Sequence, residues 1–387
     1  DTTLKSGWVQ IRAKIGSNSM EDFGGISEIL DVDILGDKSL TFSALEVESL
    51  TDFNDNETIV FEAILYDRPG NQKTGNESLN RLDIDQTLPT INYVSYKSNF
   101  TDTTLATIGD EITLSLKTSE NIQQPSITIS GNSASVTGSG TLWNASYIMQ
   151  ESDSDGIIPF EISVVNDVRG NPSSGATITT TNSSTVIFDK TKPTLDFVRI
   201  YSDNSDTTWA KTGDSVFIKF KSNELLTQSS SLIATEAAEV ISLGSQKYLA
   251  KYVMQQTDQE GDILFEVNFI DSVGISGDPV TETSNSSNVI FDRTAPLLEY
   301  VHIESNNSNN SLIAITGDDV YLTFRPFSTD PILLDSIIVS ISGQEATVSQ
   351  NGDNYSATIP ITEAIPGGFI TYAIDFVDRA GNRGDQV

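Results

Sequence analysis

The 387-residue chain contains no cysteine, one histidine, and only 22 lysines and arginines against 54 aspartates and glutamates. The lack of cysteine excludes thiolate nucleophiles, disulfides, and zinc or iron–sulfur sites with cysteine ligands. The net charge of −32 disfavours partners that are themselves negative, such as nucleic acid and anionic membrane surfaces. No apolar run approaches the ~18 residues of a membrane-spanning helix, so no membrane insertion is expected. An acidic chain attracts cations, and its charge also keeps it soluble.

Signatures of catalysis are scarce as well. The sequence contains no Gly-x-Ser-x-Gly segment, no phosphate-binding loop and no dinucleotide fingerprint. His302 has no serine or cysteine nucleophile motif beside it, and a surface position is expected for it. The sequence therefore predicts that this protein is not an enzyme.

Repetition dominates the sequence. The segment Ile84-Asp85-Gln86-Thr87-Leu88-Pro89 recurs in related form at 188–193 and 291–296, and a Gly-Asp pair recurs at 109–110, 213–214 and 317–318. We call the six-residue segment the proline motif. A fixed period of about 100 residues indicates one domain copied in tandem. The spacing predicts four domains, which we call the first to fourth repeats: 1–87, 88–191, 192–294 and 295–387.

Apolar and polar residues alternate along most of the chain, which is typical of half-buried β strands. Gly, Asn, Asp and Ser separate these stretches, as in tight turns. About seven short strands per repeat predict an all-β chain of two-sheet β-sandwiches. In the third repeat we expect strands at 194–201, 215–221, 264–270 and 288–291; the one helical candidate is 234–240.

The proline motif joins the last strand of one repeat to the first strand of the next. Proline fixes its own φ and biases the preceding residue toward extended conformations, so these junctions should be stiff. Stiff junctions at a constant period predict an elongated rod.

Segments 186–195, 210–214, 221–224 and 378–382 resemble the bacterial Ig-like tandem repeats of large extracellular surface and adhesin stalk proteins. The resemblance implies Ig-like Greek-key β-sandwiches and an extracellular location. It is weaker in the first repeat, where the segment around Trp8 lacks the Gly-Asp pair. It is also weaker near Phe327, where no glutamate matches Glu120 and Glu224.

The two ends do not match the repeats. Residues 1–4 match 102–105, which follow the first strand of the second repeat, so the first repeat is expected to lack its own first strand. The fourth repeat is expected to lack its last strand. Two explanations remain open: a segment of a longer array, and end-to-end assembly by β-strand addition between copies.

Recurring carboxylates are the candidate metal ligands, because Ca²⁺ binds six to eight hard oxygens. In a sandwich, the loop that follows the sixth strand and the proline motif can approach one another at a domain end. Calcium at these interdomain junctions is one interpretation; turn-capping aspartates are the other. The candidates are Asp67, Asp85, Asp110, Asp167, Asp189, Asp214, Glu224, Asp271, Asp292, Asp318 and Asp378.

Several short motifs suggest ligands or modifications. Candidate N-glycosylation sites, which suit exposed loops, are Asn99, Asn144, Asn182, Asn285, Asn306, Asn309 and Asn354. Arg383-Gly384-Asp385 is an integrin-type tripeptide, although three-residue matches arise easily by chance. Trp8, Trp143 and Trp209 lie at different places in their repeats, which favours packing over a shared sugar platform.

The sequence thus favours a non-catalytic extracellular structural protein: a surface stalk, an adhesin segment or a fibril subunit. Its expected partners are copies of itself or flanking repeats of the same chain, arranged head to tail. Two alternatives remain open. One is an adhesin module that binds glycans or a cell-surface receptor, for which the first repeat with Gly24-Gly25 is the candidate. The other is an accessory region of a secreted carbohydrate-active enzyme.

Overall fold

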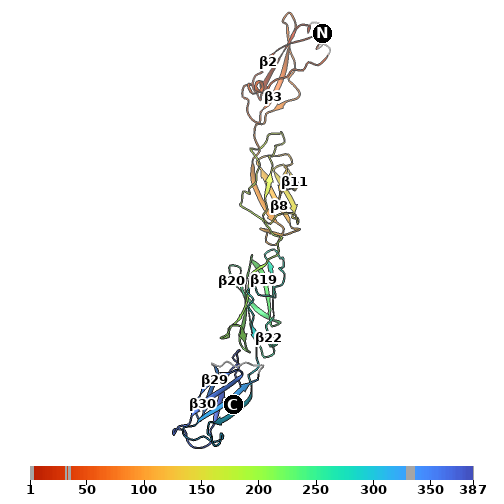
Figure 1. The fold of residues 1–387 in the computed structure, drawn as a ribbon. Helices are drawn as coiled ribbons and strands as arrows, with labels where there is room; N and C mark the ends of the chain where they lie inside the picture. The colour runs from red at the N-terminus through yellow and green to blue at the C-terminus, as the bar shows by residue number, and fades with distance from the viewer. Residues whose placement is uncertain (1–3, 31–32, 34–35, 328–335, 387) are drawn as a thin grey trace. The chain divides into compact units, whose positions relative to one another are not determined.

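The computed structural model describes residues 4–30, 33, 36–327 and 336–386. It divides into two compact units, Asp1–Lys190 and Thr191–Val387. Figure 1 shows the ribbon of the chain, coloured from red at the N-terminus to blue at the C-terminus. The prediction of an all-β chain is confirmed, because the described residues contain many strands and a single helix, α1 (Ala44–Glu48). That helix is too short to cross a membrane.

The described residues of the first repeat form one sheet where two were expected. Its order is β2-β1-β3-β4, with β5 also paired to β3. A loop with α1 covers one face, because Phe42, Val47 and Leu50 pack into the same apolar cluster as Phe23 of the sheet. The strands are β1 (Trp8–Ile15), β2 (Glu21–Glu28), β3 (Thr58–Tyr66), β4 (Gln72–Thr74) and β5 (Leu82–Asp83).

Two details of the first repeat bear on the sequence predictions. Gly24 has φ +67°, and a Cβ there would lie 2.4 Å from Phe42 Cε1, so packing explains this glycine. Helix α1 begins with a capping box between Ser43 and Glu46. The prediction from alternating apolar and polar residues missed this helix signal. Residues 1–3, which carry most of the match to 102–105, lie outside the described residues.

The second repeat forms a two-layer sandwich. Its sheets have the orders β11-β12-β8-β6 and β10-β9-β14, and a small third sheet, β13-β15-β7, lies beside them. The strands are β6 (Ile91–Ser98), β7 (Leu105–Ala106), β8 (Glu111–Thr118), β9 (Ile127–Ile129), β10 (Asn132–Ser133), β11 (Ser135–Ser139), β12 (Leu142–Ile148), β13 (Gly156–Ile157), β14 (Phe160–Ile162) and β15 (Ile187–Phe188).

The third repeat has the same plan with a longer central hairpin. Its strands are β16 (Leu195–Ser202), β17 (Trp209–Ala210), β18 (Ser215–Ser222), β19 (Leu226–Ile233), β20 (Glu236–Gly244), β21 (Lys247–Val253), β22 (Gly261–Asp262), β23 (Phe265–Asp271) and β24 (Ile290–Phe291). The four strands expected here agree with β16, β18, β23 and β24. The helical candidate at 234–240 is wrong. Ala234 and Thr235 both have positive φ and make the tight turn between β19 and β20.

In the third repeat β20 pairs with both β21 and β19, so the two layers form one sheet of order β16-β18-β21-β20-β19-β23, and β17-β24-β22 forms the small sheet. The fourth repeat has sheets β25-β26-β30-β29 and β28-β27-β31. Its strands are β25 (Leu298–Ser305), β26 (Asp319–Pro326), β27 (Ile338–Ile341), β28 (Gln344–Glu345), β29 (Thr347–Asn351), β30 (Asn354–Pro360) and β31 (Tyr372–Asp375).

The apolar core follows the repeats. Among the described residues, buried apolar side chains form four separate clusters, one within each repeat. The first residue of the proline motif packs into two of these clusters. Phe188, the last residue of β15, is fully buried in the second repeat, and Phe291, the last residue of β24, is 1% exposed in the third. The proline motif is therefore tied to the core of the repeat that precedes it in both places. The four-domain division itself stays a prediction.

Candidate metal centre in the first unit

Three carboxylates meet where the first and second repeats join. Asp85 belongs to the proline motif, just after β5. Glu120 follows β8 by two residues, and Asp167 lies in the loop after β14. An isolated bridge between Ile122 and Asp167 holds the last two segments together. One oxygen from each of Asp85, Glu120 and Asp167 lies within 4.8 Å of the other two.

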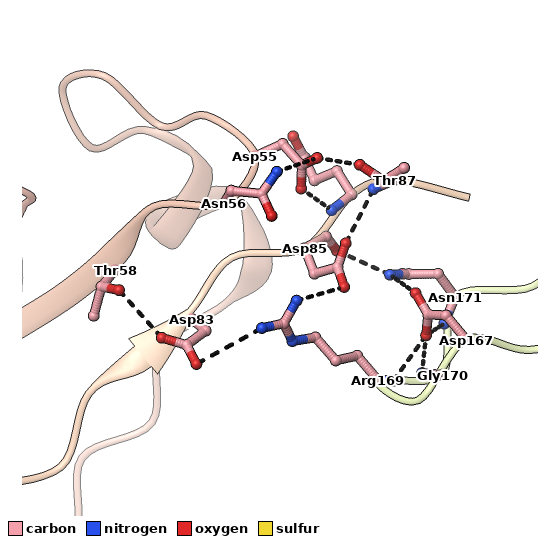
Figure 2. A network of polar contacts seen from close by, with 11 residues as sticks. Asp55, Asn56, Thr58, Asp83, Asp85, Thr87, Asp167, Arg169, Gly170 and Asn171 are labelled. Atoms are coloured by element: carbon pink, nitrogen blue, oxygen red, sulfur yellow. Dashed lines mark hydrogen bonds and ion pairs between the residues drawn. The ribbon is translucent and has the colours of Figure 1, made fainter. Parts of the chain in front are cut away.

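The loop around Asp167 is fixed by its own backbone. Asp167 Oδ1 accepts hydrogen bonds from the amides of Arg169 (2.8 Å), Gly170 (2.5 Å) and Asn171 (2.8 Å), as Figure 2 shows. Asn171 Nδ2 donates to Asp167 Oδ2 at 2.8 Å and to the Asp85 carbonyl at 3.1 Å. The Asn171 side chain thus connects the loop of the second repeat to the proline motif.

Two further contacts anchor the proline motif (Figure 2). Arg169 Nη1 lies 2.9 Å from Asp85 Oδ2, and its Nη2 lies 4.0 Å from Asp83 Oδ2. The amide of Gln86 donates to Asp55 Oδ1 at 2.6 Å, and the Thr87 hydroxyl donates to the other Asp55 oxygen. Both neighbouring repeats therefore hold the motif.

The Asp55 contact recurs, and the sequence analysis missed it. Asp155 accepts from the Lys190 amide at 2.9 Å, and Glu260 accepts from the Arg293 amide at 3.1 Å. In all three places an acidic side chain holds the residue that follows the aspartate of the motif. The separations of 31, 35 and 33 residues differ because the intervening loops differ in length, which hides the pattern in the sequence.

The surroundings of Glu120 disfavour its ionised carboxylate. Its Oε1 atom is buried and has no hydrogen-bond partner among the described residues. Burial raises the pKa of Glu120 above its ordinary value, and the charges of Asp167, Asp85 and Asp55 raise it further. Burial also acts to raise the pKa of Asp167, but the hydrogen bonds from Asn171, Gly170 and Arg169 outweigh it and the pKa is lowered. Asp167 is thus held ionised beside a glutamate that resists ionisation.

The geometry of the three carboxylates suits a hard divalent cation. Calcium binds oxygens at about 2.3–2.6 Å, so two ligands on opposite sides of the ion are about 5 Å apart. Oxygens within 4.8 Å of one another fit this limit. Three negative charges face one positive guanidinium, and a set of oxygens without nitrogen or sulfur favours Ca²⁺ over softer metals.

The other predicted ligands lie in different surroundings. Asp110, Asp214 and Asp318 each accept from the amide three residues earlier, at 2.8, 2.9 and 2.9 Å, which is the turn-capping interpretation. Asp67, Asp271 and Asp378 hold their own loops, as Asp167 does. Asp189, Glu224 and Asp271 match Asp85, Glu120 and Asp167 in sequence. Asp189 belongs to the first unit and the other two to the second, so this set stays a prediction from the sequence.

The join between the third and fourth repeats, inside the second unit, is built differently. Asn382 Nδ2 donates to the Asp292 carbonyl at 3.0 Å, as Asn171 does to Asp85. Burial, Asp378 and Glu260 raise the pKa of Asp292. Basic side chains add contacts here: Lys211 Nζ donates to the Gly381 carbonyl at 2.6 Å, and the Arg379 guanidinium lies 5.5 Å from the Trp209 ring centre. Residue 328, which matches Glu120, lies outside the described residues.

The short motifs mostly have structural roles. Arg383 is paired with Asp375, and a Cβ at Gly384 would lie 2.2 Å from the Phe376 ring, so the integrin-type tripeptide is folded against the fourth repeat. His302 is on the surface, 3.6 Å from Glu304. Trp8 stacks on Tyr66, and Trp143 is buried. The seven candidate glycosylation sites, Asn99, Asn144, Asn182, Asn285, Asn306, Asn309 and Asn354, are all exposed.

No known protein family and no curated protein matches the chain. Among solved structures, it is similar to a 1.5-MDa bacterial ice-binding adhesin, with 16% identity over 77% of this chain and 96% of that chain and a TM-score of 0.46. A Ca²⁺-stabilized adhesin of an Antarctic bacterium aligns with 13% identity over 100% and 89% (TM-score 0.40). A tetra-tandem repeat from the extending region of a large adhesion protein aligns with 17% identity over 99% and 91% (TM-score 0.29). Adhesin repeats thus occur among the similar structures, but TM-scores below 0.5 do not establish a shared family.

Proposed function

We propose that the chain is a non-catalytic segment of an extracellular stalk, and that the join between its first and second repeats binds Ca²⁺ through Asp85, Glu120 and Asp167. The observation that carries the calcium proposal is Glu120 Oε1. In the part of the chain that the structure describes, this buried carboxylate oxygen has no hydrogen-bond partner, and an oxygen of Glu120 lies within 4.8 Å of oxygens of Asp85 and Asp167. A buried, unpartnered carboxylate oxygen is costly, and a bound cation removes that cost.

The position of the ligands gives the ion a mechanical role. Asp85 lies in the linker, whereas Glu120 and Asp167 lie in the second repeat. An ion shared between them fixes the linker on the end of the second repeat, in addition to the Arg169 and Asn171 contacts. A fixed linker turns two tethered domains into one stiff piece, and this is the property that a stalk requires.

The same structural reasoning supports the extracellular location. Three carboxylates with one neighbouring guanidinium form a modest site, and extracellular modules bind Ca²⁺ with dissociation constants of about 10⁻⁴–10⁻³ M. Such a site fills only where calcium is abundant, which is outside the cell. Flanking repeats of the same kind, arranged head to tail, are the partners that this function implies.

Thermal unfolding with and without calcium tests the proposal. At a hundredfold excess over its dissociation constant, Ca²⁺ is expected to stabilise the second repeat by about 2.7 kcal/mol. For a domain of about 100 residues that corresponds to a rise in the unfolding midpoint of roughly 11–22 °C. Magnesium, which demands a smaller and more regular octahedral site, is the control and should have less effect. An unchanged midpoint when a chelator replaces calcium would contradict the proposal.

A further inference from the structure

The outer face of one sheet layer in the third repeat is basic, although the chain as a whole is strongly acidic. This layer is formed by β16, β18, β21 and β20, which are paired in that order. Side chains alternate along a strand, so every second one points away from the buried core. Five of the outward side chains are basic, and we call them the basic face: Arg199, Lys219, Lys221, Lys247 and Lys251. The whole chain has 22 basic residues, so this face gathers nearly a quarter of them.

Cations lie directly opposite one another on the basic face. Arg199 of β16 is the cross-strand partner of Lys219 of β18. Lys221 of β18 is likewise the partner of Lys247 of β21. Directly opposite residues have Cβ atoms about 4.5–5.5 Å apart, and like charges in these positions destabilise a sheet. Of the five cations, Lys221 alone forms an ion pair with a described carboxylate, that of Asp196 at 3.2 Å. The sheet thus contains repulsion that an anion bound on this face would relieve.

The equivalent faces of the neighbouring sandwiches lack these opposed cations. In the second repeat the cross-strand pair that matches the first of them consists of two serines, Ser95 and Ser115. In the fourth repeat the matching pair is His302 and Thr323. The sandwich therefore forms without two lysine or arginine side chains at these positions, and their presence in the third repeat indicates a role other than folding.

Aromatic rings hold two of the cations in place. The rings of Tyr201 and Phe217 stack on the same face, with centres 5.2 Å apart. The Arg199 guanidinium lies 5.2 Å from the Tyr201 ring centre, and the Lys251 ammonium lies 5.8 Å from the Phe217 ring centre. These cation–π contacts restrict both long side chains, so less conformational entropy is lost when the side chains bind an anion.

The arrangement of the cations suits a narrow, linear polyanion. Neighbouring strands lie about 4.8 Å apart, and alternate residues of one strand lie about 6–7 Å apart. The five cations therefore form a grid across β16, β18 and β21. Carboxylates border this grid, with Asp196 paired to Lys221 and Glu239 opposite Lys251. A narrow chain laid along the grid meets the cations, whereas a wide anionic surface also meets the carboxylates beside them and is repelled.

This reasoning separates the classes of polyanion. Duplex nucleic acid, an anionic membrane and an acidic protein surface are all wide. Single-stranded nucleic acid is narrow, but its bases bind by stacking on free aromatic rings. On the basic face, Arg199 and Lys251 already lie over the rings of Tyr201 and Phe217. An acidic polysaccharide is narrow, carries its charges at regular intervals and needs no aromatic ring.

From these observations we propose that the basic face binds a linear polysaccharide of uronic acids. Its carboxylates lie beside Arg199, Lys219 and Lys247 and relieve the repulsion within the two opposed pairs. The Asp196 carboxylate on Lys221 shows the same contact within the chain. The proposal adds a ligand to the stalk and does not use the calcium site, so either can fail alone.

Calorimetric titration of the full chain with an oligogalacturonate tests the proposal, with chelator present so that the calcium site plays no part. Saturable binding that weakens as salt is added is expected. Lys219→Gln with Lys247→Gln removes one cation from each opposed pair and should weaken binding at least about tenfold. The matched control is Lys97→Gln with Lys117→Gln, at two exposed lysines on the equivalent face of the second repeat, and it should bind like the wild type. No binding, or equal weakening by the two double substitutions, overturns the proposal.

Two other polyanions test the class of ligand. Poly-glutamate stands for an acidic polypeptide and oligothymidylate for single-stranded nucleic acid, both at the same charge as the oligogalacturonate. Both should bind more weakly than the oligogalacturonate does. Tighter binding of either one overturns the assignment to a polysaccharide.

Unfolding of the third repeat distinguishes a binding role of Lys219 from a structural one. In a background with Trp8→Phe and Trp143→Phe, urea unfolding monitored by Trp209 fluorescence reports this repeat. Without ligand, Lys219→Gln should raise the urea midpoint, because it removes the repulsion from Arg199. A lower midpoint would show that Lys219 stabilises the fold and would overturn the proposal.

Discussion

Replacing Phe188 by alanine is expected to lower the free energy of unfolding of the second repeat by about 3–5 kcal/mol. Phe188 is fully buried and belongs to the strand that closes this core between β7 and β13. Its removal leaves a cavity against Ala106 and the rest of the cluster. The substitution also loosens β15, which begins the proline motif at 188–193. The second repeat therefore loses stability and holds that motif less firmly.

The unfolding of the second repeat can be monitored separately from that of the other repeats. The three tryptophans lie in the first three repeats, and Trp143 is the one inside the core of the second. In a background with Trp8→Phe and Trp209→Phe, urea unfolding monitored by Trp143 fluorescence reports the second repeat. Ile187→Ala is the matched control, since Ile187 is 44% exposed on the other face of the strand, and its effect should be below about 1 kcal/mol. Equal effects of the two substitutions would show that β15 does not close the core.

Replacing Glu120 by glutamine is expected to change stability in opposite directions with and without calcium. The pKa of Glu120 is raised, so the folded chain binds the proton of the Glu120 carboxyl group more tightly than the unfolded chain does. The linked stability is therefore lost as pH rises from the ordinary value of 4.5 through the raised pKa of Glu120, and the penalty is complete above that raised pKa. Without calcium, Glu120→Gln removes this penalty and should raise the unfolding midpoint. With calcium, it removes a ligand and should cost most of the roughly 2.7 kcal/mol gained from binding.

Glu161→Gln is the control for this pair of measurements, because Glu161 is an exposed carboxylate of β14 in the same repeat. It should change the midpoint by the same small amount in calcium and in chelator. The pH dependence gives a second check. In chelator, the difference between wild type and Glu120→Gln should shrink as pH falls below 4.5, where Glu120 is protonated in both states. If the Glu120→Gln chain is stabilised by calcium as much as the wild type, Glu120 is not a calcium ligand.

The fold was largely predictable from the sequence, because strand positions depend on local alternation. Strands β16, β18, β23 and β24 lie close to their expected ranges. The errors occur where local signals mislead. The 234–240 segment has an apolar spacing that suggested a helix, but positive φ at Ala234 and Thr235 makes a hairpin turn. The single sheet of the first repeat depends on Phe42 packing across the chain on Phe23, which no local pattern reveals.

The site was predictable only in part. Recurrence identified Asp85 and Asp167 as candidates, and Glu120 was visible as a residue shared with the third repeat. The sequence could not separate them from Asp110, which has the same recurrence but caps its own turn. Asp55 was missed because its distance from the motif varies among repeats. In both cases the deciding fact is which carboxylates meet in space, and that depends on how the loops fold.

The central claim, that calcium stiffens the join between the first and second repeats, is best tested by a distance between them. The chain has no cysteine, so Thr74→Cys and Ser139→Cys provide two exposed sites for spin labels and no others. Double electron–electron resonance should give a narrow distribution of distances between the two spin labels in calcium and a broader one in chelator. In a Glu120→Gln chain the distribution should stay broad in both. Equal widths in calcium and chelator for the chain with Glu120 would contradict the account.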